Sequence, residues 1–190
     1  GQRFKTAGYK KHKSLIDILG KNIIEKLMDN FNSDVEIFII TSEKIYSQIK
    51  EEINPDIQFI LIEDHKLGPA FTIYKAQKYI PPKRPIFISY CDIYWNWEKS
   101  IFKKVIDKSD AAIFTHSGFH PHLVKNSFSA FCKADDTNCQ LLEIKEKGSF
   151  TNNWMEEKLS IGVFYVKDIN LLQSPLEIMI KKNQKVCDEF

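Results

Sequence analysis

The sequence predicts an α/β protein with a Rossmann-like, mostly parallel mixed sheet and helices on both faces. Three observations support this fold class. Strand-like and helix-like segments alternate along most of the 190 residues, as they do in strand–helix–strand units. The apolar run at residues 84–92 ends abruptly on Asp92, which is typical of a strand buried on both faces of a parallel sheet. Beyond residue 115, strands separated by polar loops predict an added mixed or antiparallel part.

Each element follows from a local pattern. Apolar residues at helical spacing predict a helix at about 22–31, and a β-branched run predicts a strand at 35–40. A Ser cap before Pro175 predicts that the last helix begins at Ser174. The other expected elements are a helix from 42 to about 52, a strand at 57–62, a helix from Gly68-Pro69, the strand ending at Asp92, a helix around 101–106, and strands at 111–115, 127–133, 140–145 and 161–166.

Length and composition indicate one globular domain over residues 1–190. The chain is 43% hydrophobic and 27% charged with a net charge of +2, so it has no strong attraction to nucleic acid or to a membrane. No signal peptide or membrane-length apolar run is visible, which predicts a cytoplasmic protein and leaves a homo-oligomer open. The sequence starts on a loop and stops after a helix, so we expect that the domain's first strand and its C-terminal segment are missing. The four cysteines lack the spacing of a zinc site or a disulfide framework.

Asp92 is the first candidate for chemistry. Open α/β sheets bind ligands at the carboxyl ends of their strands, and a carboxylate there can hold a divalent cation that in turn holds phosphates. The alternative is an Asp that begins a turn or caps the next helix. The sequence around Asp92 leaves both open.

The basic N-terminal loop is the second candidate. It holds five cations near Gly1 and Gly8, and glycine lets a backbone approach a phosphate closely while the cations neutralise it. The alternative is a solvated basic loop, although the cluster leads directly into an apolar segment and a helix. Its cations are Arg3, Lys5, Lys10, Lys11 and Lys13.

Taken together, several motifs resemble the sugar nucleotidyltransferases, enzymes of a GT-A-like α/β fold. The opening Gly-Gln-Arg-Phe at 1–4, Lys-Ser-Leu at 13–15 and Gly-Lys-Asn-Ile-Ile at 20–24 are similar to that family's phosphate loop and the segment after it. Further along the chain, the matching segments are Gly-Pro-Ala at 68–70, Tyr-Cys-Asp at 90–92, Glu-Lys at 146–147, Gly-Val-Phe-Tyr at 162–165 and the closing Glu-Phe at 189–190. These matches occur in the family's order. His12, Asn22 and Gly148 stand where the family usually has proline.

The resemblance implies a role for each matched residue. Gly1 would belong to the nucleotide-binding loop, Arg3 would bind the β- and γ-phosphates, and Lys13 would neutralise charge at the α-phosphate. Gly68 and Ala70 would contact the base or ribose through backbone groups, and Asp92 would hold Mg²⁺. Glu146 and Lys147 would bind a phosphorylated acceptor, Lys147 at its phosphate.

Two further groups rank lower. His116, His120 and His122 are more easily interpreted as a loop at the rim of the acceptor pocket than as a metal site, because no carboxylate or cysteine is spaced to complete one. The aromatic residues after Asp92 (Tyr94, Trp95 and Trp97) either stack on the acceptor or cover the edge of the sheet.

The resemblance implies that the chain transfers a nucleoside monophosphate from an NTP to a sugar 1-phosphate or a phosphocholine-like compound, releasing pyrophosphate, as in capsule polysaccharide biosynthesis. Two alternatives stay open. A GT-A glycosyltransferase would use a nucleotide sugar, but would not need a basic triphosphate loop. A non-catalytic domain would bind a nucleotide without turnover.

Overall fold

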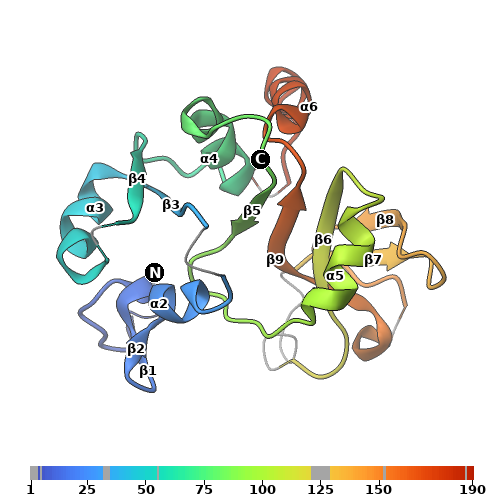
Figure 1. Cartoon of the computed structure of the whole chain (residues 1–190), viewed down its shortest axis with the longest axis horizontal. Coiled ribbons are helices and arrows are strands. Elements are labelled where there is room, and N and C mark those ends of the chain that lie inside the picture. Colours follow the sequence, from blue (N-terminus) through green and yellow to red (C-terminus); the bar gives the residue numbers. More distant parts are fainter. Residues whose placement is uncertain are drawn as a thin grey trace. The chain divides into compact units, whose positions relative to one another are not determined.

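The computed structural model describes residues 4, 6–31, 35–54, 56–120, 129–151, 153–186 and 188–190 (Figure 1). The chain divides into two compact units. The first unit consists of Gly1–Arg84, Tyr90–Trp97 and Ile169–Phe190, and the second of Pro85–Ser89 and Glu98–Asp168. Among the described residues, no helix has the length and apolar character that a membrane span requires.

The first unit contains two small sheets and several helices. β1 and β2 form an antiparallel hairpin, and β3 and β4 are parallel strands joined through α3. α4 and α6 lie side by side (Figure 1). The elements of the first unit are η1 (Lys13–Leu15), β1 (Asp17–Ile18), β2 (Lys21–Asn22), α2 (Ile23–Met28), β3 (Phe38–Thr41), α3 (Glu43–Ile49), η2 (Lys50–Glu52), β4 (Gln58–Leu61), α4 (Pro69–Ala76), η3 (Gln77–Tyr79) and α6 (Asn170–Lys181).

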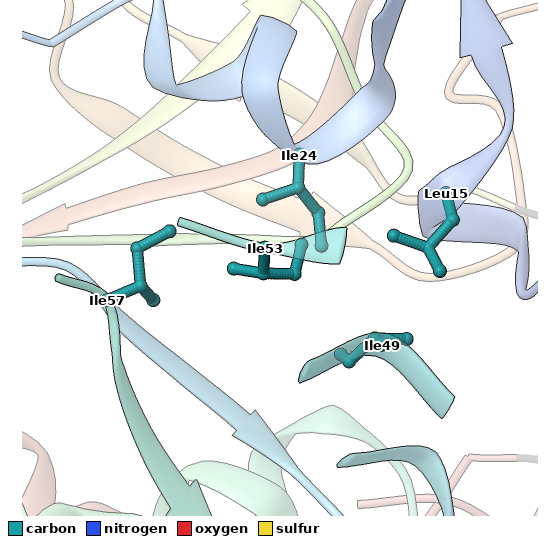
Figure 2. Close-up of a cluster of buried hydrophobic side chains, with 5 residues drawn as sticks. All are labelled: Leu15, Ile24, Ile49, Ile53 and Ile57. Carbon is teal, nitrogen blue, oxygen red and sulfur yellow. The ribbon is translucent and has the colours of Figure 1, made fainter. Parts of the chain in front are cut away.

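A cluster of buried aliphatic side chains anchors the N-terminal part of this unit. Leu15 is the last residue of the short helix η1, Ile24 belongs to α2 and Ile49 to α3, and all three are almost fully buried. Burying an aliphatic side chain of this size stabilises the fold by about 1.5–3 kcal/mol. Figure 2 shows the five buried members, which are Leu15, Ile24, Ile49, Ile53 and Ile57. The cluster therefore fixes the backbone that carries Lys13.

The second unit is built on one sheet with β9 at its centre. β9 pairs antiparallel with β5, β6 and β7, and β7 pairs antiparallel with β8. β9 has neighbours on both edges, and several of its side chains, including Val163 and Tyr165, are buried. The elements of the second unit are β5 (Ile86–Ser89), α5 (Lys99–Ile106), β6 (Ala111–His116), β7 (Phe131–Ala134), β8 (Leu141–Lys145), η5 (Trp154–Glu156) and β9 (Lys158–Val166).

The mixed α/β class is confirmed, but the pairings differ from the predicted mostly parallel sheet. Among the described strands β3 and β4 are parallel, whereas the other pairings are antiparallel. β5 and β6 run in the same direction, as a strand–helix–strand unit requires, since both are antiparallel to β9. β9 lies between them: Val166 is the register partner of both Ile86 and Ala111. A strand distant in sequence thus separates two strands that local alternation suggested would be neighbours.

One local prediction was wrong, and one element was not predicted. The last helix begins at Asn170, not at Ser174, and Pro175 lies inside it. Proline disfavours a helix interior, but packing of α6 against α4 outweighs that preference. The β1–β2 hairpin was not predicted. Its turn uses Leu19 and Gly20, both at positive φ (57° and 82°), which suits the twist of a two-residue hairpin.

Candidate nucleotide-binding site

Lys13 is held in place by the residues on either side of it. Leu15 anchors η1 in the aliphatic cluster, and Ser14 is 1% exposed. His12 caps η1: its Nδ1 lies 2.7 Å from the Ser14 hydroxyl and accepts a longer contact, 3.4 Å, from the Ser14 backbone N–H. His12 therefore stabilises the turn that presents Lys13.

Asp92 lies in the turn that follows β5, and so beyond the end of the strand rather than on it. Trp95, shortly after it, is buried, and its ring packs edge-on against Phe31 at a centroid distance of 6.2 Å. Phe31 also contacts Trp97, at 6.5 Å. This aromatic packing fixes the segment after Asp92. It favours the interpretation of Trp95 as a side chain that covers the fold over one that stacks on a ligand.

The structure brings Lys13 and Asp92 into direct contact, although 79 residues separate them in the sequence. Lys13 Nζ donates a hydrogen bond to Asp92 Oδ2 at 2.7 Å, and the two side chains are 26% and 34% exposed. Exposed ion pairs of this kind contribute at most about 1 kcal/mol to stability. The pair leaves an ammonium and a carboxylate within reach of solvent, where a charged ligand can exchange with either partner.

Cys91 adjoins this pair. Burial raises the pKa of the Cys91 thiol, the Lys13 ammonium opposes the rise, and the Asp92 carboxylate reinforces it. A thiol with a raised pKa stays protonated at neutral pH and is a poor nucleophile. Cys91 is therefore a packing residue beside the site, as its place in an apolar run suggested.

Asp92 is better suited to a magnesium ion that binds together with the phosphates of a nucleotide than to an ion held by protein side chains alone. Within the described chain, no group of three or more His, Cys, Asp or Glu side chains is placed to hold a metal. Mg²⁺, however, is commonly bound through one or two carboxylates and the phosphates of a substrate. One carboxylate beside a lysine fits that mode of binding.

Gly68 and Ala70, expected to contact a base or ribose, are covered by the last residues of the sequence. The Ala70 N–H donates to the Phe190 carbonyl at 3.4 Å, and the Phe190 N–H donates to the Leu67 carbonyl at 2.9 Å. Gly68 has φ +87°, and a Cβ there would lie 2.7 Å from the Phe190 carbonyl oxygen. The need for glycine at this position is thus explained by the fold itself. Phe190 also stacks on Phe71, at 6.1 Å and 21°.

The basic loop is described from Thr6 onward, apart from the isolated Phe4. Gly1, Arg3 and Lys5 lie outside the described residues, so their predicted roles stay predictions. Lys11 Nζ forms an ion pair with Glu52 at 2.5 Å. An open hollow of about 320 Å³ lies beside η1, and it is lined by Tyr9, Lys10, Lys11, Leu15, Ile16 and Asp17.

Glu146 and Lys147 belong to the second unit, in the turn after β8. Lys147 has φ +54°, a left-handed conformation that is uncommon for a residue with a side chain. Within the described chain, neither side chain forms a hydrogen bond or an ion pair. Both are therefore available to a ligand.

Sequence reasoning missed Glu157, a carboxylate of the second unit that accepts four hydrogen bonds from described residues. Glu157 accepts hydrogen bonds from residues 149–151, next to the turn that holds Lys147. A Glu preceding a strand carries no signal that distinguishes it from a surface residue. The rings of His116 and His120 lie 6.1 Å apart, and His122 lies outside the described residues.

No protein-family model and no curated protein matches the sequence. Solved structures do resemble the fold. The nucleoside-diphosphate-sugar pyrophosphorylase from Vibrio cholerae RC9 has a TM-score of 0.76 and 12% identity, over 100% of this chain and 79% of that chain. The inositol-1-phosphate CTP transferase from T. maritima has a TM-score of 0.68 and 16% identity, over 100% and 72%.

A third structure, assigned as a glucose-1-phosphate thymidylyltransferase from Bacillus anthracis, has a TM-score of 0.62 and 14% identity, over 92% of this chain and 68% of that chain. Identities this low carry information about fold and not about substrate. The mixed α/β fold of this chain is therefore one that is found in nucleotidyltransferases.

Proposed function

We propose that the chain is a nucleotidyltransferase that joins a nucleoside monophosphate from an NTP to a phosphorylated acceptor. A phosphate oxygen of the acceptor attacks the α-phosphorus and forms a new P–O bond. The bond between the α-phosphorus and the bridging oxygen breaks, and pyrophosphate leaves with the electron pair. The nucleophile is already an anion, so the reaction needs charge neutralisation and positioning more than a general base.

The observation that carries this proposal is the contact between Lys13 and Asp92. A bound triphosphate would exchange that contact: Lys13 would turn to the α-phosphate, and Asp92 would hold the Mg²⁺ that accompanies the nucleotide. The ion would supply further neutralisation of the phosphate charge. Near 4 Å, like unit charges repel by about 4 kcal/mol at an effective dielectric constant of 20, so each well-placed cation matters.

The other roles follow the sequence resemblance. Gly1 would belong to the nucleotide-binding loop, Arg3 would bind the β- and γ-phosphates, and Glu146 and Lys147 would bind the acceptor. Gly68 and Ala70 would meet the base or ribose. The bond from Ala70 N–H to Phe190 is long at 3.4 Å, so a nucleotide carbonyl could replace that acceptor at little cost. A sugar 1-phosphate or a phosphocholine-like compound is the proposed acceptor, with cytoplasmic synthesis of capsule or other surface glycans as the setting.

The test is a screen for pyrophosphate release. The purified chain is incubated with Mg²⁺, each of ATP, CTP, GTP and UTP, and acceptors that include glucose 1-phosphate and phosphocholine. We expect release with at least one pair and none when the acceptor is omitted. Sugar transfer from a nucleotide sugar without pyrophosphate would instead indicate a glycosyltransferase. Nucleotide binding that survives both Lys13→Ala and Asp92→Ala, without turnover, would indicate a non-catalytic domain.

A further inference from the structure

We propose that Glu157 is a positioning residue for the acceptor: it holds residues 149–151, and with them the turn of Glu146 and Lys147, in the conformation that receives a phosphorylated compound. The inference deepens the proposed function and rests on it for the identity of what the turn binds. Its geometric part, that one carboxylate orders this turn, stands on the second unit alone.

The Glu157 carboxylate is surrounded by donors from one short segment. Both of its oxygens are used, and two of the donors are backbone N–H groups that would otherwise need water. The four hydrogen bonds come from Ser149 Oγ (2.5 Å), Phe150 N (2.8 Å), Thr151 N (2.6 Å) and Thr151 Oγ1 (2.7 Å). A carboxylate that accepts several bonds from consecutive residues fixes their backbone much as an N-cap fixes the first turn of a helix.

The same segment is also held from the β8 side. Lys145 Nζ donates to the Ser149 carbonyl at 2.6 Å, and Phe150 packs against the buried Phe131 and Leu159. Lys147 lies between these two anchors at φ +54°. A left-handed residue with a side chain is unfavourable, and persists where its surroundings impose it. The bonds to Glu157 and Lys145 are those surroundings.

The ionisation of Glu157 agrees with this arrangement. Partial burial alone would raise the pKa of the carboxyl group. The hydrogen bonds from Ser149, Thr151 and Phe150 outweigh it and lower the pKa to about 2. Glu157 is therefore fully charged at neutral pH, when its four bonds are charge-assisted.

A second loop is tied to the residues just before Glu157. The Gly118 N–H donates to the Met155 carbonyl at 2.8 Å, and Met155 belongs to η5. The segment from η5 to Glu157 thus holds both the loop that follows His116, the last residue of β6, and carries His120, and the turn that carries Lys147. The sequence had predicted that both would border the acceptor.

The experiment compares Glu157→Gln with Glu156→Gln. Glutamine has the same shape, but its side-chain NH₂ group is a hydrogen-bond donor. That group would face the donors of residues 149–151 and could not accept their hydrogen bonds. Glu156 is the adjacent exposed residue, and its side chain forms no hydrogen bond or ion pair within the described chain, so it controls for the loss of one charge. Glu157→Asp, which keeps the charge on a shorter side chain, and Thr151→Val, which removes one donor, serve if Glu157→Gln folds poorly.

Two readouts are measured on each variant, and neither needs turnover. Amide hydrogen exchange at Phe150 and Thr151 should be at least about 10-fold faster in Glu157→Gln and unchanged in Glu156→Gln. The Kd for glucose 1-phosphate or phosphocholine, from amide shifts of residues 146–151, should rise about 10-fold, with the Kd for the nucleotide unchanged. Glu157→Asp should restore part of both effects.

Unchanged exchange would show that Phe150 packing and the hydrogen bond from Lys145 hold the turn without Glu157, and would overturn the inference. Faster exchange with an unchanged Kd for the acceptor probe would show that the ordered turn has no part in binding. That result would also overturn the inference. Absence of pyrophosphate release by the wild type, alongside acceptor binding that depends on Glu157, would refute the proposed reaction and leave the positioning role intact.

Discussion

At the scale of single residues, two Lys–Asp ion pairs of the first unit can be compared by how deeply their side chains are buried. Lys13–Asp92 joins distant parts of the sequence with side chains that are about two-thirds buried or more. Lys21–Asp29 is a local pair with both side chains half exposed, and its hydrogen bond raises the pKa of Lys21. Neither pair is buried enough to govern the fold. Ion pairing alone therefore does not explain the position of Lys13, and its role in binding an anion stays a prediction.

We predict that Lys13→Ala lowers the turnover number by at least about 100-fold, because the α-phosphate loses a fixed cation as charge develops. The free energy of unfolding should fall by no more than about 1 kcal/mol, as for other exposed ion pairs. Pyrophosphate release and urea denaturation measure the two effects. Lys21→Ala is the matched control and should leave turnover unchanged. A loss of stability that accounts for the loss of activity would make Lys13 structural.

Glu157 gives a prediction on pH. Its pKa is about 2 in the folded chain and 4.5 in an unstructured one, so between these values the unfolded state binds more protons. The stability that Glu157 contributes is fully present above pH 4.5 and is lost as the pH falls towards 2. The urea midpoints of wild type and Glu157→Gln should therefore differ most near pH 7 and converge below about pH 4.5. A difference that is the same at pH 7 and pH 3 would show that ionisation of Glu157 is not involved.

At the scale of elements, the entry to α4 is shaped by residues 189–190. Gly68 is at φ +87°, and an added Cβ would lie 2.7 Å from the Phe190 carbonyl oxygen and 2.8 Å from Glu189 Cβ. Gly20 has a similar φ of +82° in the β1–β2 turn, but nothing lies within 4 Å of the Cβ it would gain. The two glycines share the strain of a left-handed residue and differ in steric overlap.

We therefore predict that Gly20→Ala costs about 1 kcal/mol and Gly68→Ala at least about 2 kcal/mol, since the second substitution adds the cost of overpacking against backbone atoms. Denaturant unfolding of the two variants, side by side, measures the difference. Equal losses would show that residues 189–190 move away from α4 without cost. That outcome would also leave Ala70 N–H more accessible to a nucleotide than the 3.4 Å bond to Phe190 suggests.

How far the sequence predicts these elements depends on whether the signal is local. The start of α2 was predicted at about residue 22 from the spacing of apolar residues, and α2 does begin at Ile23. Its reciprocal capping box, formed by Asn22 and Glu25, is a local signal of the same kind. The place of β9 between β5 and β6 could not be predicted, because no local pattern records which distant strand becomes a neighbour. Pro175 led to a wrong start for the last helix for the same reason. The preference of proline for the first turn of a helix is a local signal, and helix–helix packing outweighed it.

The candidate site shows the same division. Motif resemblance identified Lys13 and Asp92, and the structure places them 2.7 Å apart; their roles remain predictions. The resemblance gave no warning that the partner of the Ala70 N–H would be Phe190. Glu157 escaped notice in part because two of its four donors are backbone N–H groups, which leave no trace in residue identity.

At the scale of the whole molecule, a ligand that binds only the folded chain must stabilise it. At 100 times its Kd, such a ligand adds about 2.7 kcal/mol. We predict that an accepted NTP with Mg²⁺ raises the Tm of the wild type by several degrees, and that removing Mg²⁺ with EDTA abolishes much of the rise.

In Asp92→Asn the part of that rise that depends on Mg²⁺ should disappear, because the carboxylate that would hold the ion is gone. A smaller rise from the nucleotide alone should remain, since the substitution leaves the Lys13 ammonium in place to meet a phosphate. Asp29→Asn, which breaks the other Lys–Asp pair, should respond like the wild type. If Asp92→Asn and Asp29→Asn gave the same shifts with and without Mg²⁺, then Asp92 would be only the structural partner of Lys13, and the ion would have to be held elsewhere.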